Sequence, residues 1–91
     1  MLTFDDFSGS IGKDFEVAVG EGAQALRLSS ADELPHGIRD GGSFRLEFSG
    51  PVSPILPQAI YAMREGGRDL EIFIVPISAG AAGARYEAIF N

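Results

Sequence analysis

His36 is the only histidine of this 91-residue sequence, and it lies shortly after Ser29, Ser30 and Asp32. A serine hydrolase uses these three residue types, because the histidine takes the proton of the serine nucleophile while a carboxylate orients the histidine. No nucleophile-elbow pattern surrounds these serines, so nothing in the sequence would hold one of them on a sharp turn. The pattern favours a surface histidine, and we predict that the protein is not an enzyme and has no catalytic residue.

Neighbouring carboxylates could form an acid–base pair or hold a metal ion, and the chain has two such pairs, Asp5–Asp6 and Asp32–Glu33. The first pair is explained more simply by the positive end of a helix that begins there. The spacing of a calcium-binding loop is absent, and "DGG" at positions 40–42 indicates only a turn. The segments "GEG" and "GAAG" have no following Lys-Ser or Lys-Thr to bind phosphate. We therefore expect neither a metal site nor a cofactor.

Composition narrows the class of protein. Apolar residues make up 45% of the chain and charged residues 22%, which is typical of a globular protein, and we expect residues 1–91 to form a single β domain. The formal net charge of −6 is spread along the sequence, and it repels phosphate backbones, so nucleic acid is not an expected partner. The sequence shows no signal peptide and no apolar run of about 18 residues. We expect a cytoplasmic protein with no membrane partner, and the absence of cysteine adds no information on compartment.

The first residues have the pattern of a short helix. Thr3 and Asp6 resemble a capping box, and Phe4, Phe7 and Ile11 fall on one helical face. Because a buried phenylalanine is worth about 1.5–3 kcal/mol, this helix should cover an apolar surface.

Alternation of apolar and polar residues replaces the helical period after position 12. Six segments have this alternation or are bounded by turn residues, and we expect each to form a strand. They cover residues 13–19, 23–30, 43–49, 58–65, 69–78 and 85–91. The residues predicted to face inward include Phe15, Val17, Val19, Leu26, Leu28, Phe44, Leu46, Phe48, Tyr86, Ala88 and Phe90. This pattern predicts a mainly β protein, a small antiparallel six-stranded sandwich or barrel with one short N-terminal helix.

The connections between these segments differ in kind. Residues 30–43 are polar and contain Pro35 and several glycines, so we expect a long loop. Residues 50–57 contain three prolines, which predict a stiff, extended crossing. Residues 79–84, "AGAAGA", are expected to form a flexible loop that lets the last strand pair with residues 70–77. The chain end would then be part of the sheet.

One expected strand is apolar on both faces. In "LEIFIVPI", Leu70, Ile72 and Ile74 lie on one face, and the other face carries three further apolar residues, Phe73, Val75 and Ile77. Antiparallel strands usually have one face in water, so this strand needs two covers. The second cover could be the N-terminal helix, the opposite wall of a barrel, or another subunit. Pro76, which lacks an N–H, indicates a sheet edge, a bulge or the end of a strand.

Four ordered motifs in the second half of the chain, "FSGP" (48–51), "LPQAIY" (56–61), "FIVPI" (73–77) and "YEAIFN" (86–91), resemble a bacterial family of unknown function. The resemblance covers residues 44–91. It implies a genomic setting beside phage-tail-collar or tail-fibre-like genes, and it brings no established activity. Family members usually have glycine at the position of Ala59 and often a histidine near Arg64. Among the motif residues, Gln58 and Glu87 could either satisfy backbone groups of loops or face a partner, and Tyr61 can bury its ring while its hydroxyl bonds to backbone or water.

These observations favour a non-enzymatic structural or assembly module that binds another protein, either a phage-tail-like component or a second copy of itself. Its expected interface comprises Phe73, Val75, Ile77, Gln58 and Tyr61. The implied setting also allows incorporation into a phage-tail-like particle. The alternative is a small β-barrel that binds a small ligand or a glycan through aromatic residues and the loop at residues 30–43, and it predicts a deep pocket instead of a filled interior.

Overall fold

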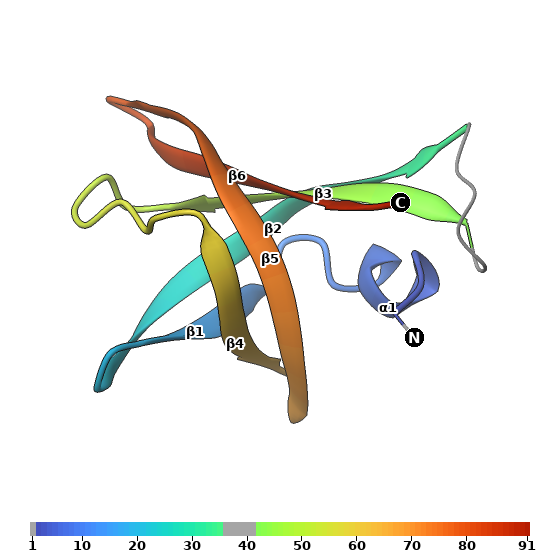
Figure 1. The fold of residues 1–91 in the computed structure, drawn as a ribbon, viewed down its shortest axis with the longest axis horizontal. Helices are drawn as coiled ribbons and strands as arrows, with labels where there is room; N and C mark the ends of the chain where they lie inside the picture. The colour runs from blue at the N-terminus through green and yellow to red at the C-terminus, as the bar shows by residue number, and fades with distance from the viewer. Residues whose placement is uncertain (1, 36–41) are drawn as a thin grey trace.

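A computed structural model of the chain shows a closed antiparallel β-barrel (Figure 1). The structure describes residues 2–35 and 42–91, and within them six strands follow a single helical turn. The elements are α1 (Asp5–Ser8), β1 (Asp14–Val19), β2 (Gly22–Leu34), β3 (Ser43–Gly50), β4 (Ala59–Glu65), β5 (Arg68–Gly80) and β6 (Gly83–Phe90). The strands follow one another around the barrel in the order β1-β2-β3-β6-β5-β4, and β4 closes against β1. The predicted fold class is confirmed, and of its two forms the barrel is correct.

The interior of the barrel is filled by the residues that alternate inward along the strands, together with Phe7 of α1 and Leu56 between β3 and β4. Bulky apolar side chains dominate it, as expected for a small barrel in which side chains occupy the whole interior. Its fully buried large members are Tyr86, Phe7, Phe15, Phe44, Phe48, Leu26, Leu28, Leu46, Leu56, Ile72, Ile74 and Val17. Phe90, predicted to face inward, is partly buried and stacks on Phe44 with ring centroids 4.5 Å apart. The last strand lies between β3 and β5, so the chain end is part of the barrel wall.

The helical turn α1 covers one end of the barrel (Figure 1). Asp6 accepts a hydrogen bond from the Thr3 N–H at 2.7 Å, which is one half of the predicted capping box. Phe7 is fully buried and its ring lies 5.8 Å from that of Phe44. The predicted helical face is shorter than expected, because α1 ends at Ser8 and Ile11 remains 48% exposed.

A partly buried ion pair between Glu65 and Arg68 connects this N-terminal cap to the β4–β5 hairpin. Glu65 is 9% exposed, and its Oε1 accepts hydrogen bonds from Arg68 Nη2 at 2.7 Å and from Ser10 Oγ at 2.9 Å. Arg68 also donates from Nη1 to the carbonyl oxygen of Asp6 at 2.8 Å. Arg68 in the first place, and the Ser10 hydroxyl in the second, lower the pKa of Glu65.

The proline-rich crossing between β3 and β4 covers the opposite end (Figure 1). As predicted, residues 51–58 form no regular strand. Leu56 is buried there, and its N–H donates to the Tyr86 hydroxyl oxygen at 2.8 Å. This hydrogen bond holds the crossing against the interior side of β6.

The prediction of a long loop at residues 30–43 is wrong over its first five residues. Residues 30–34 continue β2 and pair with β3, from Ser30 opposite Glu47 to Leu34 opposite Ser43, after a bulge between Leu28 and Ser30. Three of these five residues are polar, and the bulge interrupts the alternation, so the pattern alone does not indicate a strand. Residues 36–41 of the predicted loop lie outside the described residues.

The flexible loop predicted at residues 79–84 is also wrong. β5 continues to Gly80 and β6 begins at Gly83, and the two glycines face each other across a two-residue turn. Gly83 has a φ of +118°, and a Cβ added to it would lie 2.7 Å from the carbonyl oxygen of Gly50. Glycine is therefore required here by the backbone conformation and by a close approach of β3, and not by flexibility.

Candidate interaction surface

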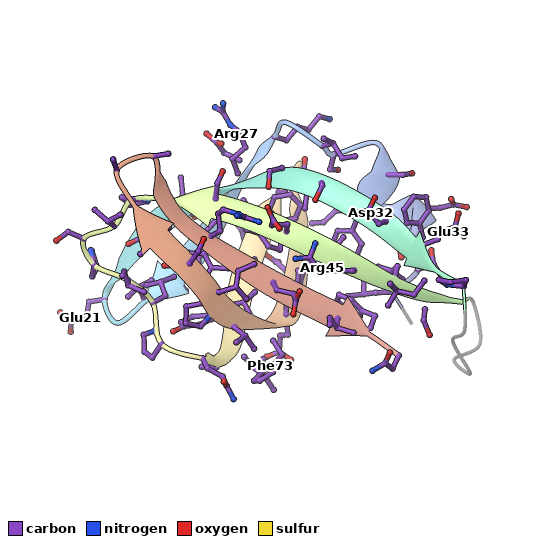
Figure 2. The ribbon with its side chains drawn as sticks, turned by 90° about the horizontal axis from the view of Figure 1, so that it is seen from above. Glu21, Arg27, Asp32, Glu33, Arg45 and Phe73 are labelled. Carbon is purple, nitrogen blue, oxygen red and sulfur yellow. The ribbon has the colours of Figure 1, made fainter. Side chains whose placement is uncertain are left out.

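The outer face of the β4–β5 hairpin carries exposed apolar side chains. Ile60 of β4 lies directly opposite Phe73 of β5, and the two side chains are 67% and 46% exposed. The neighbours of Phe73 on β5, Ile72 and Ile74, point into the barrel and are buried. Since side chains alternate along a strand, Phe73 must point outward (Figure 2). A directly opposed pair on one face of an antiparallel sheet has Cβ atoms about 4.5–5.5 Å apart, so Ile60 and Phe73 form one continuous patch.

The patch continues toward the C-terminal end of β5. Val75 is partly buried and lies opposite Glu87 of β6. Pro76 pairs with Tyr86 beside a bulge, as its missing N–H predicted, and the bulge leaves Ile77 40% exposed. The outward face of β5 is thus apolar from Phe73 to Ile77.

The N-terminal helix doesn't cover this face. Phe7 of α1 contacts the rings of Phe15, Phe44 and Phe90 at the end of the barrel. The opposite wall of the barrel covers the inward face of β5, not the outward one. The two covers within the chain that the sequence suggested for the second face of β5 are therefore wrong. A cover from outside the chain stays a prediction.

The other two predicted interface residues lie elsewhere. Tyr61 sits between Ile60 and Ala62 on the alternate face of β4, is partly buried, and donates from its hydroxyl to the Pro57 carbonyl at 2.6 Å. Burial, followed by the neighbouring Tyr86, raises the pKa of the Tyr61 hydroxyl. Gln58 is exposed in the crossing just before β4. The structure thus groups Phe73, Val75 and Ile77 of β5 with Ile60 of β4. The sequence did not single out Ile60, because apolar and polar residues do not clearly alternate around it.

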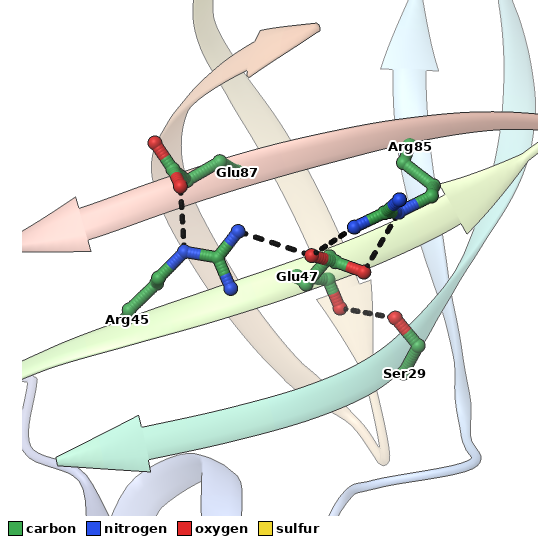
Figure 3. Close-up of polar contacts among 5 residues, drawn as sticks. All are labelled: Ser29, Arg45, Glu47, Arg85 and Glu87. Atoms are coloured by element: carbon green, nitrogen blue, oxygen red, sulfur yellow. Dashed lines mark hydrogen bonds and ion pairs between the residues drawn. The ribbon is translucent and has the colours of Figure 1, made fainter. Parts of the chain in front are cut away.

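The outer face of β3 and β6 differs in character, because it holds a ladder of ion pairs (Figure 3). Glu47 and Glu87 lie directly opposite each other, an arrangement that would be repulsive without cations. Arg45 binds both carboxylates, with nitrogen–oxygen distances of 3.0 Å to Glu47 and 2.5 Å to Glu87. Arg85 binds Glu47 through two hydrogen bonds of 2.9 Å. Glu87 therefore bonds to Arg45 and not to the backbone of a loop, and the alternative that it faces a partner stays a prediction.

These contacts set the ionisation of the ladder. Hydrogen bonds from Arg85, and then from Arg45, hold the pKa of Glu47 below its usual range, although burial opposes the shift. Hydrogen bonds to Glu87 and Glu47 raise the pKa of Arg45. Ser29 donates from Oγ to the Glu47 carbonyl at 2.9 Å, so its hydroxyl has a structural contact. The ladder is a neutralised polar surface.

The residues considered for chemistry do not come together in the part of the chain that the structure describes. Asp32 and Glu33 lie exposed on β2 (Figure 2), and Asp6 bonds to the backbone of Thr3. Among residues 2–35 and 42–91, no three histidine, cysteine or carboxylate side chains gather in a way that could hold a metal ion. His36 lies outside the described residues. No described helix is long and apolar enough to cross a membrane.

Comparison with known proteins gives a family for the chain. No curated protein and no solved structure is significantly similar to it. A domain of unknown function, DUF6916, matches residues 2–90, which extends the resemblance seen in the second half over nearly the whole sequence. The chain belongs to this DUF6916 family of domains of unknown function.

Proposed function

We propose that this protein is a non-enzymatic structural or assembly module that binds another protein through the outer face of its β4–β5 hairpin. The observation that carries the proposal is the exposed pair Ile60 and Phe73, continued by Val75 and Ile77 on β5. A closed barrel uses its inner face for the core, and residues 2–35 and 42–91 supply no second layer over these side chains. Contiguous exposed apolar patches often mark protein interaction sites.

The size of the patch suits the centre of an interface. Fully burying a large apolar side chain contributes about 1.5–3 kcal/mol, so completing the burial of half-exposed Phe73 and Ile60 contributes roughly 1–2 kcal/mol each. Large apolar and aromatic side chains at the centre of an interface, surrounded by polar residues, usually carry most of the binding energy. The polar ladder of β3 and β6 lies next to the patch and provides such a rim.

The resemblance to a family encoded beside tail-collar and tail-fibre-like genes supports a partner protein from a phage-tail-like assembly. In the other form of the proposal, the partner is a second copy of this chain. Incorporation into such a particle after synthesis in the cytoplasm belongs to the same proposal. The packed interior of the barrel weighs against the alternative of a small-ligand or glycan-binding barrel, because residues such as Phe48, Leu46 and Tyr86 occupy the space that a ligand would need.

Introducing a negative charge into the patch tests the proposal. Phe73→Asp should abolish co-purification with the product of the adjacent gene, or dissociate the oligomer measured by sedimentation. Ile11→Asp is a matched control, because Ile11 is exposed to the same degree, 48% against 46%, but lies beside α1. Circular dichroism verifies that both variants fold. A strict monomer that ignores its neighbour's product, or equal loss in both variants, would contradict the proposal.

A further inference from the structure

The barrel is weakly closed between β1 and β4. Only two residue pairs join these strands, Glu16 with Arg64 and Val17 with Met63, whereas the β4–β5 pairing extends along the whole of β4. Within the described residues, positions 59–62 of β4 have no strand on the side that faces β1. Positions 18–19 of β1 are likewise unpaired on the side that faces β4. Backbone groups along such an edge can pair with an added strand.

A groove of about 720 Å³ lies on the outer surface over β1, β2, β4 and β5, and it reaches the point where β1 and β4 separate at Ala18 and Ala62. Small residues form much of its lining, since Ala18, Ala23 and Ala62 are exposed there. Short side chains leave the backbone of β1 and β4 accessible from outside. The groove therefore combines open strand edges with room for the side chains of an extended segment.

The charges around the groove define what it can bind. Glu16, Asp69 and Glu71 line it together with a single cation, Arg64, which donates to Asp69 at 2.9 Å. Glu71 is exposed and lies directly opposite Ala62, so a long cationic side chain could reach it across that alanine. Every arginine in residues 2–35 and 42–91 is already bound to a carboxylate. The groove thus carries an excess of negative charge that the arginines of the described residues do not neutralise.

We propose that an extended, basic segment of a partner protein adds as a strand to the edge of β4 at residues 59–62 and lies in this groove. Main-chain hydrogen bonds would give affinity, and basic side chains at alternate positions would face Glu71 and Glu16. A second copy of this chain does not fit the charge, since the protein has a net charge of −6 and its own β4 edge carries no free cation. The inference rests on the proposed function and adds the chemistry of the partner and the place where it binds.

A peptide probe tests the inference directly. The probe is a seven-residue peptide of alternating arginine and valine with blocked ends, and the control peptide has glutamate in place of arginine. Amide NMR spectra of the full chain should show that only the basic peptide shifts the signals of residues 18–19 and 59–62 and slows their exchange. Glu71→Lys should weaken binding about three- to tenfold, because it replaces an attraction with a repulsion. Glu33→Lys changes the net charge equally at the end of β2, away from the groove, and should change the affinity less than about twofold (Figure 2).

Each other outcome would overturn the inference. Equal weakening by both charge reversals would show non-specific attraction, and failure of the basic peptide to bind would remove the strand-addition site. NMR shifts confined to Ile60 and Phe73 would place binding on the apolar patch. That result would support the proposed function and refute strand addition. Protection of residues 59–62 by self-association without peptide would make the occupant a second copy and refute a basic partner. The Phe73→Asp experiment measures binding of the partner protein and not binding of the peptide, so the two proposals can fail independently.

Discussion

Replacing Tyr86 by phenylalanine removes a single oxygen atom from the interior of the barrel. In the structure this oxygen accepts the Leu56 N–H at 2.8 Å, and both residues are buried. Without it, a backbone donor is left unsatisfied away from water, which costs about 1–3 kcal/mol. Since 1 kcal/mol shifts the melting temperature of a domain of this size by roughly 4–8 °C, we expect Tm to fall by about 8–16 °C for a loss near 2 kcal/mol.

The matched control is Tyr61→Phe, which removes the hydroxyl that donates to the Pro57 carbonyl. That contact is exposed, so water can replace it and the expected loss is about 0.5 kcal/mol. Urea unfolding of both variants gives the free energies, and hydrogen exchange should show faster exchange of the Leu56 amide only in Tyr86→Phe. Equal losses in the two variants, or an unchanged Leu56 exchange rate, would refute the view that this bond holds the crossing in place.

Two further substitutions test the turn and the cap. Gly83→Ala should destabilise the protein by at least about 2 kcal/mol in urea unfolding, because it combines a φ of +118° with a Cβ 2.7 Å from the Gly50 oxygen. Gly80→Ala in the same hairpin meets no atom within 4 Å and should cost less than about 1 kcal/mol, and similar losses would contradict this explanation. Arg68 lowers the pKa of Glu65, so the Glu65 carboxylate stabilises the folded state at pH values above its ordinary pKa of 4.5. This contribution is lost as the pH falls through the lowered pKa of the folded state. Glu65→Gln should therefore reduce stability at pH 7 and flatten its decrease below about pH 4.5, and an unchanged acid profile would show that the pair does not contribute.

The core of this protein could be predicted from sequence because its strands show clear alternation. Phe15 and Val17 in β1, and Phe44, Leu46 and Phe48 in β3, are separated by polar residues, and all five are buried. A period of two leaves only one choice of inward face for such a strand. The same rule predicted that the chain end would be part of the sheet.

The extent of β2 and of the β5–β6 hairpin could not be predicted in this way. Residues 30–34 have little apolar character, and their strand conformation depends on pairing with β3, which supplies partners for their backbone groups. Gly80 and Gly83 suggest flexibility when read alone, yet both lie in a ladder. In each case the deciding interaction comes from a residue distant in sequence, such as Gly50 for Gly83.

The candidate interaction surface was predicted in part, for a related reason. Phe73 stood out because its strand is apolar on both faces, but Ile60 acquires meaning only from the register that places it opposite Phe73. Tyr61 was expected beside Phe73, whereas its own strand turns it to the other face. Pairing register is a tertiary property, and a shift by one residue would exchange the two faces of β4.

Two outer faces of the same barrel differ in a way that supports an interface. On β3 and β6, the opposed carboxylates of Glu47 and Glu87 are neutralised by Arg45 and Arg85, and the surface is polar. On β4 and β5, the outward side chains of Ile60, Phe73 and Ile77 are apolar and exposed instead, whereas the other end of the hairpin carries charged residues such as Arg64 and Asp69. Both faces belong to one continuous sheet and meet water under the same conditions, so solubility alone would favour the polar solution on each. An apolar patch on one outer face, beside a second face whose charged groups are paired with one another, supports the proposal that a partner covers the patch.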